Sequence, residues 1–496
     1  MKDQLFELIT LVSGQPYNPL WEEKLPFILN GLVFVAIFVI LFFYFYHKYF
    51  WQEKTSRKLF FFTLSTVVFL IVAKYVLYHF YQGYVSDRLF FYALPSPRAK
   101  NFIWFLLPCI IFILFLFFQQ KIEKLPKNKF LAVISLFFII FTLSVAGIRD
   151  GLFSIIDPLT RSYWEYTGSL PLVQEMGVKN FISQFSSILS QLPIHTQTHP
   201  PGYVLFLFFW QNLLLVGYLG LAVILVIIAS LTVLPLYYLW EKVISPVTAR
   251  KMVEVFIFIP SLVIFSATSM EAFFILIVWL AIVLCFFGWK KNLWLSLIGG
   301  LVLAYALFSN FLFLLLTPFF LALFVYILKT TNSGRTKIIA RAVFSGIVCL
   351  FFFIILKYWG GYSVVDNFFV ARDINKQLVE SNFVSVGIYF QYLAMNILAF
   401  LTYLGVPLCI IFFSDLPCTF KKSGFWFKAG VGILFFFLLV GIFQGEIERI
   451  WLFIVPFFIP FFSHLYSKYN STQFRAVLSL LFFQIIIFSV LFYTYW

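Results

Sequence analysis

Apolar residues form long stretches along most of the chain, and short polar segments separate them. A helix that crosses a bilayer needs about 20 predominantly apolar residues, and about fourteen stretches reach or approach that length. The pattern therefore predicts an all-α polytopic membrane protein with about 14 transmembrane helices. The stretches fall at about 27–46, 59–78, 102–119, 129–147, 217–239, 252–268, 271–288, 292–308, 311–328, 339–357, 386–413, 429–444, 450–466 and 474–494.

One further apolar stretch, 202–214, begins directly after Pro200-Pro201, and only a few residues separate it from the next stretch. If it does not cross the membrane, the basic connectors all lie on one face, which the positive-inside bias makes cytoplasmic. If it crossed, every later basic connector would lie outside. We therefore predict an interfacial or re-entrant helix here. The connectors are 47–58, 120–129, 240–251, 289–292, 329–341, 415–428 and 467–475.

This topology places both termini and two long loops, 148–200 and 358–385, on the extracytoplasmic side. Loops of this length are commonly functional. In the first loop, apolar residues recur at helical spacing beside Ser and Gln, which predicts an amphipathic helix on the membrane surface. These apolar residues are Phe181, Phe185, Ile188, Leu189 and Leu192.

Composition supports the membrane assignment. Hydrophobic residues make up 62% of the 496 residues and charged residues only 11%, whereas soluble domains contain roughly 25% charged residues. A soluble enzyme is thereby excluded. The formal net charge of +15 would suggest nucleic acid in a soluble chain, but here it is an orientation signal. We expect membrane lipids, and no nucleic acid, as partners.

Ionisable residues inside the apolar stretches are few, and Lys74 and Glu254 stand out among them. An ion or proton pathway normally contains several such groups, so this scarcity argues against transport. Carboxylates, cations, aromatics and histidines gather instead in the loop 148–200. A carboxylate at a helix end can act as a general base on a hydroxyl, and arginine can hold a phosphate. Together they suit transfer from a lipid phosphate.

The order of these features resembles a known superfamily. A carboxylate, Asp150, lies where a helix leaves the membrane, and a long loop then ends in His199-Pro200-Pro201-Gly202 before an apolar helix. Pro260-Ser261 and an acid, Glu271, follow at the next outward turn. This arrangement resembles the GT-C superfamily of polyprenyl-phosphate-sugar-dependent glycosyltransferases, which includes protein mannosyltransferase and aminoarabinose transferase relatives. The resemblance covers about residues 129–330.

The resemblance implies a mechanism in which an acid of the first large outward loop deprotonates the acceptor hydroxyl. The sugar carbon is then attacked with inversion, and polyprenyl phosphate leaves. Asp150 is the first candidate for this base because it lies at the helix exit. Glu165 is the second, since the flanking Trp164 and Tyr166 would stack on a sugar, and Asp157 is the third.

Other loop residues are candidates for substrate binding. His195 and His199 are four residues apart, which leaves open a divalent metal, hydrogen bonds to sugar or phosphate, or a structural turn; no cofactor is assigned. Glu271 lies at a narrow outward turn at membrane level. The cations Arg161, Arg372, Lys376 and Arg449 are candidates for contact with the donor phosphate, with Glu448 beside the last of them.

We expect three regions: N-terminal transmembrane helices at 1–128, a GT-C-like core at 129–357, and C-terminal helices at 358–496. The expected function is transfer of a sugar from a polyprenyl-phosphate carrier to a lipid, glycan or protein acceptor. It would take place at the extracytoplasmic face of a prokaryotic plasma membrane, in the cell envelope. A transporter, flippase or polymerase of lipid-linked envelope sugars is the alternative.

Overall fold

The computed structural model describes residues 21–81, 89–161, 163–331, 334–378, 382–422 and 424–494. These residues are almost entirely helical, and the strand-like pairing among them is one isolated bridge between Pro95 and Phe492. Ten of the described helices are long and apolar enough to cross a membrane. The expected all-α fold is thereby confirmed, and the protein is a multi-pass membrane protein.

The helices follow one another with short connections. The first half contains α2 (Trp21–Phe45), η1 (Tyr46–Phe50), α3 (Lys54–Phe80), α5 (Phe102–Glu123), α6 (Lys127–Asp150), α7 (Leu152–Thr160), η2 (Tyr166–Ser169), α8 (Leu170–Met176), α9 (Val178–Ile188), η3 (Leu189–Gln191), α10 (Ile194–Gln197), α11 (Gly202–Leu214), α12 (Tyr218–Leu231) and α13 (Val233–Val243). The second half contains α14 (Pro246–Phe256), α15 (Pro260–Phe265), α16 (Ala272–Lys291), α17 (Leu293–Ser309), η4 (Phe311–Leu316), α18 (Thr317–Thr330), α19 (Arg335–Gly360), α20 (Val364–Leu378), η5 (Asn382–Val384), α21 (Val386–Lys422), α22 (Phe425–Leu439), α23 (Ile447–Ile450), η6 (Val455–Phe462), α24 (Ser463–Ser467) and α25 (Ser471–Leu491).

Prolines interrupt two of the predicted stretches. The stretch 252–268 is divided between α14 and α15, and Pro260 is the first residue of α15. Proline lacks an amide donor and disfavours helical geometry in the residue before it, so a new helix begins there. The stretch 450–466 contains a turn, the 3₁₀ helix η6 and the short α24, because Pro456 and Pro460 interrupt it.

The ambiguous stretch 202–214 forms α11, a helix of 13 residues. At 1.5 Å per residue α11 is about 20 Å long, which is shorter than the roughly 30 Å of hydrocarbon in a bilayer. Its length fits the predicted interfacial or re-entrant helix. Two further apolar helices, α17 and α22, are also shorter than the ten candidate spans.

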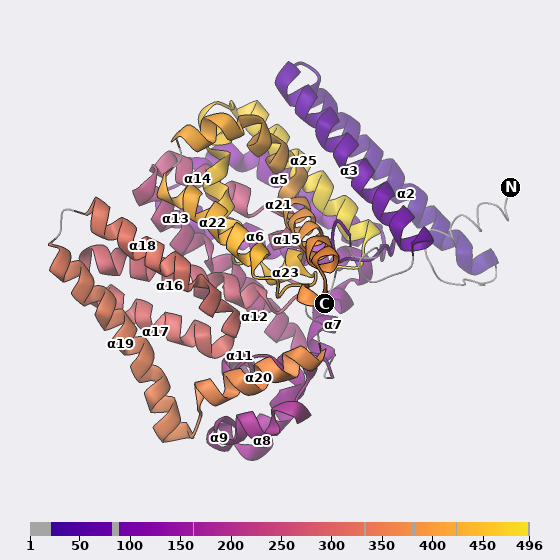
Figure 1. Cartoon of the computed structure of the whole chain (residues 1–496). Helices are drawn as coiled ribbons and strands as arrows, with labels where there is room; N and C mark the ends of the chain where they lie inside the picture. Colours follow the sequence, from indigo (N-terminus) through magenta and orange to yellow (C-terminus); the bar gives the residue numbers. More distant parts are fainter. Residues whose placement is uncertain are drawn as a thin grey trace.

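The most buried of the candidate spans is α25, which lies in the middle of the molecule against α3, α6, α15 and α21. In Figure 1, α2 and α3 lie side by side at one edge, and α16 to α19 form the opposite edge. The spans α2 and α19 are the least buried, as expected for helices whose apolar side chains face lipid.

Small residues bring α16, α17 and α19 close together. A Cβ atom at Gly288 would lie 2.4 Å from the backbone nitrogen of Ser296, and one at Gly300 would lie 2.3 Å from the carbonyl oxygen of Ser345. The Ser345 hydroxyl lies 2.8 Å from the Ser296 carbonyl oxygen, to which it donates. Membrane helices associate through such close packing because lipid provides no hydrophobic driving force between them.

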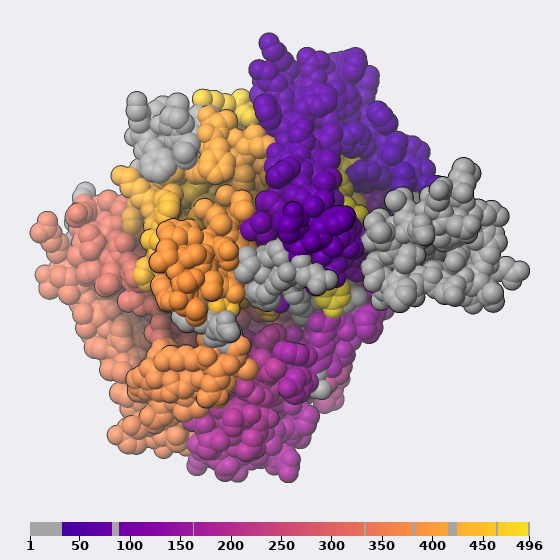
Figure 2. All heavy atoms as spheres, turned by 45° about the vertical axis from the view of Figure 1, so that its right-hand side comes forward, coloured from indigo at the N-terminus to yellow at the C-terminus, as the bar shows by residue number. Residues whose placement is uncertain are grey.

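The loop after α6 folds into a cap of short helices, α7 to α10. Gly151, at φ +65°, ends α6 and lets the chain turn into α7. An amphipathic helix, α9, forms in this loop and buries Phe181, Ile182 and Phe185 within the protein. Its expected place on the membrane surface stays a prediction. Helix α20 packs on α9 and α10, and Figure 2 shows the magenta cap beside the orange α20 at the lower end of the molecule.

Candidate functional site

Asp150, the first candidate base from the sequence, lies at the C-terminal end of α6 and is 6% exposed. Its carboxylate forms an ion pair of 2.5 Å with Arg98. The neighbouring Arg149 donates hydrogen bonds to the carbonyl oxygens of Ser96 and Phe492. Both residues therefore attach the end of α6 to the extended segment before α5.

Asp157, the third candidate base, lies one turn before Arg161, and their side chains form an ion pair. Arg161 also donates a hydrogen bond to the hydroxyl of Tyr493, near the end of the chain. The guanidinium of Arg161 therefore contacts both a carboxylate of α7 and a phenol of the C-terminal segment, and it connects these two parts of the structure.

Glu165, the second candidate base, is the acid that the structure pairs with a histidine. Its carboxylate is 4% exposed, and its Oε2 lies 2.9 Å from Nδ1 of His195. An ionised carboxylate can only accept, so the imidazole donates. The pairing depends on backbone contact between the two segments, since the amide of His195 donates to the carbonyl oxygen of Trp164 at 3.0 Å.

Aromatic rings and a second histidine surround this pair. The ring of Tyr166 lies 6.0 Å from that of His195, 5.5 Å from that of His199 and 4.8 Å from that of Tyr203. The Tyr203 hydroxyl donates to the carbonyl oxygen of Met270 at 3.0 Å. The first turn of α11 is thereby joined to the start of α16.

Glu271 and Arg449 form an ion pair, and Arg449 is the only arginine or lysine of this site among the described residues. Glu271 precedes α16 and also accepts a hydrogen bond from Ser269. The guanidinium of Arg449, 5% exposed, bonds to both Glu271 and Glu446. Its Nε has no hydrogen-bond partner in the described part of the chain.

The Glu165–His195 pair and the Glu271–Arg449 ion pair belong to one cluster. The charge of Arg449 acts on Glu165 and His195, and that of Glu271 acts on His195 and Tyr166. We refer to these eight residues as the polar cluster: Glu165, Tyr166, His195, His199, Tyr203, Glu271, Glu446 and Arg449. Helix direction puts the cluster opposite the basic connectors, because Glu271 precedes α16 and Lys290 and Lys291 end it.

Burial and neighbouring charges separate the pKa values of the two histidines. Burial alone would lower the pKa of His195, but the hydrogen bond and the charge of Glu165 outweigh it, so the pKa is raised. Burial lowers the pKa of His199 to about 4. Burial would raise the pKa of Glu271, but the charge of Arg449 reverses the effect and lowers it. Neutral His199 thus lies beside a histidine that titrates above its usual range.

The segment that carries Arg449 has an unusual backbone. Gly445 has φ +101° and Glu446 has φ +58°, a left-handed conformation that few non-glycine residues adopt. Two side chains fix this turn, since Asn382 and Asn396 each donate to the carbonyl oxygen of Phe443 at 2.9 Å. The turn is therefore firmly held in the conformation that directs Arg449 into the cluster.

The remaining sequence candidates lie elsewhere. Glu448 is buried and accepts hydrogen bonds from the backbone amides of Tyr92 and Ala93 at 2.6 and 3.1 Å, so it anchors the segment before α5. Trp164 is 51% exposed. Arg372 and Lys376 lie on the exposed side of α20, where Arg372 pairs with Asp373 at 2.8 Å.

The sequence analysis does not select two members of the cluster, Tyr203 and Glu446, or Ser269, which donates a hydrogen bond to Glu271. Tyr203 follows the Pro-Pro-Gly sequence directly. Glu446 lies three residues before Arg449, with which it forms an ion pair. Chain position alone gives no signal for Tyr203, because nothing in the sequence shows that α11 and α16 touch.

Close packing against α17 explains why a glycine follows the two prolines at position 202. A Cβ atom at this position would lie 2.4 Å from the carbonyl oxygen of Phe308, at the end of α17. Tyr305 also donates a hydrogen bond of 3.3 Å to the Gly202 carbonyl oxygen. The absence of a side chain lets the first turn of α11 touch α17, and this contact places Tyr203 in the cluster.

An apolar groove of about 530 Å³ runs along the other side of α11. Its lining residues from α11 recur at a spacing of three or four positions, so they share one helix face, and Val178 of α9 completes the lining. That face is opposite to Tyr203, Val204 and Leu207, which are buried. The groove is lined by Val178, Leu205, Phe208, Phe209, Asn212 and Leu213.

The histidines do not form part of a recognisable metal centre. Within the described ranges, no group of three or more His, Cys, Asp or Glu side chains is arranged to hold a metal ion. Nδ1 of His195 bonds to Glu165, and Nδ1 of His199 donates to the carbonyl oxygen of His195 at 2.7 Å. Comparisons of the chain with protein-family models, curated proteins and solved structures find no match.

Proposed function

We propose that this membrane protein is a GT-C-type glycosyltransferase that moves a sugar from a polyprenyl-phosphate carrier to an acceptor hydroxyl at the extracytoplasmic face. The observation that carries the proposal is the pair of buried Glu165 and partly exposed His195 beside Arg449. A proton acceptor and a cation next to each other are what attack by a hydroxyl on a phosphate-activated sugar requires. The proposal retains the topology of about fourteen spans.

In this mechanism His195 takes the proton of the acceptor hydroxyl, and Glu165 orients the ring and stabilises its charged form. The His195 side chain is 27% exposed, so an acceptor can reach part of it. The hydroxyl oxygen attacks the anomeric carbon, and the bond between that carbon and the phosphate oxygen breaks. Polyprenyl phosphate leaves with the bonding electrons, and the configuration at the carbon inverts.

The charges of the polar cluster suit such a transition state. Glycosyl transfer passes through an oxocarbenium-like state, in which the sugar carries positive charge. Three carboxylates, those of Glu165, Glu271 and Glu446, would stabilise that charge. Arg449 would contact the departing phosphate, since its Nε has no partner among the described residues.

The groove along α11 supports a lipid-linked donor. It is apolar, and it lies on the same helix whose first turn carries Tyr203 into the cluster. An isoprenoid chain in this groove would lie in contact with the membrane while its phosphate reaches the cluster. The isoprenoid chain is already out of water in the bilayer, so the groove would contribute close packing and a fixed position for the donor, and not a hydrophobic gain.

The test is release of polyprenyl phosphate by the purified protein in vesicles that contain labelled polyprenyl-phosphate sugars. We expect turnover by the wild type and a loss of roughly 10²- to 10⁴-fold in Glu165→Gln and in His195→Gln. Asp157→Asn is the matched control, because its carboxylate pairs with Arg161 and lies outside the polar cluster.

Two outcomes would contradict the proposal. If Glu165→Gln and His195→Gln turn over like the wild type, the pair is not the proton acceptor. If no donor is consumed but labelled lipid-linked sugar crosses the vesicle membrane, the protein is a flippase and not a transferase.

A further inference from the structure

A second apolar groove lies between α18 and α22 and shares no residue with the polar cluster. Its volume is about 790 Å³, within the range of small-molecule sites in proteins. The walls are formed by side chains such as Phe319, Leu321, Val325 and Phe436. Leu321 is 61% exposed, so the groove opens to the surroundings of the protein.

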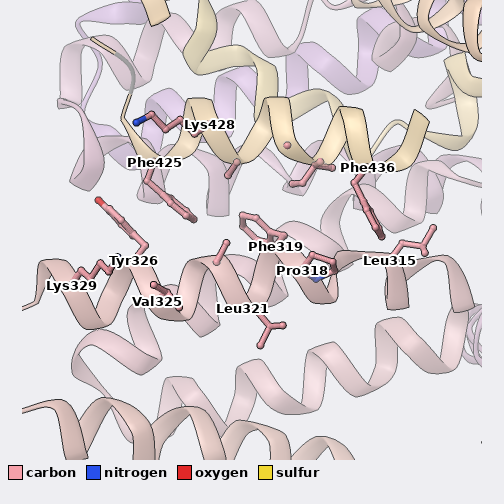
Figure 3. Close-up of a pocket in the computed structure, with 14 residues that line it drawn as sticks. Leu315, Pro318, Phe319, Leu321, Val325, Tyr326, Lys329, Phe425, Lys428 and Phe436 are labelled. Carbon is pink, nitrogen blue, oxygen red and sulfur yellow. The ribbon is translucent and has the colours of Figure 1, made fainter. Parts of the chain in front are cut away.

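Polar groups occur at only one end of this groove. Figure 3 shows Lys329 of α18 and Lys428 of α22 at the same end, with Tyr326 beside them. Both lysines are exposed, and neither forms a salt bridge within the described residues. The Tyr326 ring stacks on that of Phe425 at 4.3 Å, which joins the two helices there. Two ammonium groups thus lie at one end of the apolar groove.

The length of the groove fits one leaflet of a bilayer. The part of α18 between Pro318 and Lys329 is roughly 16 Å long at 1.5 Å per residue. Half of a hydrocarbon core of about 30 Å is about 15 Å. A lipid chain that follows the groove from one leaflet would therefore bring its headgroup to Lys329 and Lys428.

We propose that this groove is a specific site for an anionic phospholipid from the leaflet at the basic face. An acyl chain fills the apolar part, and the phosphate binds Lys329, Lys428 and the Tyr326 hydroxyl. Zwitterionic lipids offer the same chains without net negative charge, so the two lysines select between them. The site is independent of the proposed sugar transfer.

Gly432 allows the apolar half of the site to be tested. It lines the groove, and a Cβ atom there would meet no atom within 4 Å. A leucine at this position would project into the groove while the helix keeps its packing. Gly346 of α19 is the matched control, because a Cβ atom there also meets no atom within 4 Å and the residue lies outside the groove.

The experiment is native mass spectrometry of the full-length protein with phosphatidylglycerol or phosphatidylcholine of identical acyl chains. We expect the wild type to prefer phosphatidylglycerol by roughly tenfold or more, as two cationic side chains near a lipid headgroup provide. The double variant Lys329→Gln/Lys428→Gln should lose that preference. Gly432→Leu should weaken binding of both lipids, and Gly346→Leu should bind them like the wild type.

Lys124 and Lys242 provide the control for charge, since both are exposed lysines of the basic face outside the groove. Lys124→Gln/Lys242→Gln removes the same charge and should keep the preference for phosphatidylglycerol. The proposal is overturned if this pair loses the preference to the same extent, or if the wild type binds both lipids equally. Unchanged thermal unfolding of each variant shows that the comparison concerns binding and not folding.

Discussion

At the scale of single residues, the polar cluster combines four segments that the chain separates widely. Glu165 and His195 are 30 positions apart, and Arg449 lies 178 positions after Glu271. The sequence indicated each of these residues because charged side chains are scarce in an apolar chain. The sequence does not show which of these side chains contact one another. Position at a helix end makes Asp150 the first candidate base, but in the structure Asp150 pairs with Arg98.

The pH dependence of turnover tests the proposed pair at this scale. Histidine accepts a proton only in its neutral form, and the carboxylate of Glu165 raises the pKa of His195. Activity should therefore rise with pH and reach half its maximum above pH 6.5, the usual value for histidine. Glu165→Gln removes the negative charge, so the residual activity should reach its half-maximum at a lower pH.

The measurement is kcat/KM against pH for both proteins with the same lipid-linked donor. Asp157→Asn should keep the wild-type profile, since Asp157 lies outside the polar cluster. A purely structural role of Glu165 would lower activity equally at every pH. An unshifted profile in Glu165→Gln would therefore remove the proposed link between the two residues.

At the scale of elements, backbone breaks inside apolar segments limited what hydropathy could predict. α21 bends at Gly405, where φ is +117°, although the stretch 386–413 looks uniform in the sequence. A side chain of another helix provides the backbone hydrogen bonds that the bend removes from α21. Gln484 of α25 accepts from the amide of Val406 at 2.9 Å and donates to the carbonyl oxygen of Thr402 at 2.7 Å. Hydropathy predicts where the helix lies. It does not predict that the backbone around Gly405 forms hydrogen bonds with a glutamine of another helix.

Replacement of this glutamine should destabilise the protein. Gln484→Leu fills a similar volume but leaves the Val406 amide and the Thr402 carbonyl without partners in an apolar interior. Each unsatisfied buried group costs about 1–3 kcal/mol, so we expect a loss of roughly 2–4 kcal/mol in the free energy of unfolding. The measurement is unfolding of the detergent-solubilised protein by heat or denaturant.

Ser489, on the same helix, provides the control for that comparison. Its hydroxyl is buried and has no hydrogen-bond partner in the described part of the chain, so Ser489→Ala should change stability little. Equal stability losses in Gln484→Leu and Ser489→Ala would mean that the glutamine does not support the bend.

At the scale of the whole molecule, the fold joins two loops that lie far apart along the chain. The loops 148–200 and 358–385 are predicted to lie on the same side of the membrane, and in the structure their helices α9 and α20 pack together. The orientation of that side in the membrane depends on the basic connectors alone. Spans and faces follow from hydropathy and charge, whereas the contact between the two loops depends on apolar residues such as Phe181 and Ile182.

Labelling of single cysteines with a membrane-impermeant maleimide in intact cells tests this arrangement. Lys179 of α9, Lys376 of α20 and Lys124 are exposed, so a cysteine at each position would react wherever the reagent reaches it. With Cys349 and Cys418 replaced by serine, we expect Lys179→Cys and Lys376→Cys to react from outside and Lys124→Cys to react only after lysis. Labelling of Lys124→Cys alone would reverse the orientation and place the polar cluster in the cytoplasm, where an extracytoplasmic transferase cannot work. Labelling of only one of Lys179→Cys and Lys376→Cys would contradict the packing of α9 against α20, because adjacent helices must be accessible from the same side of the membrane.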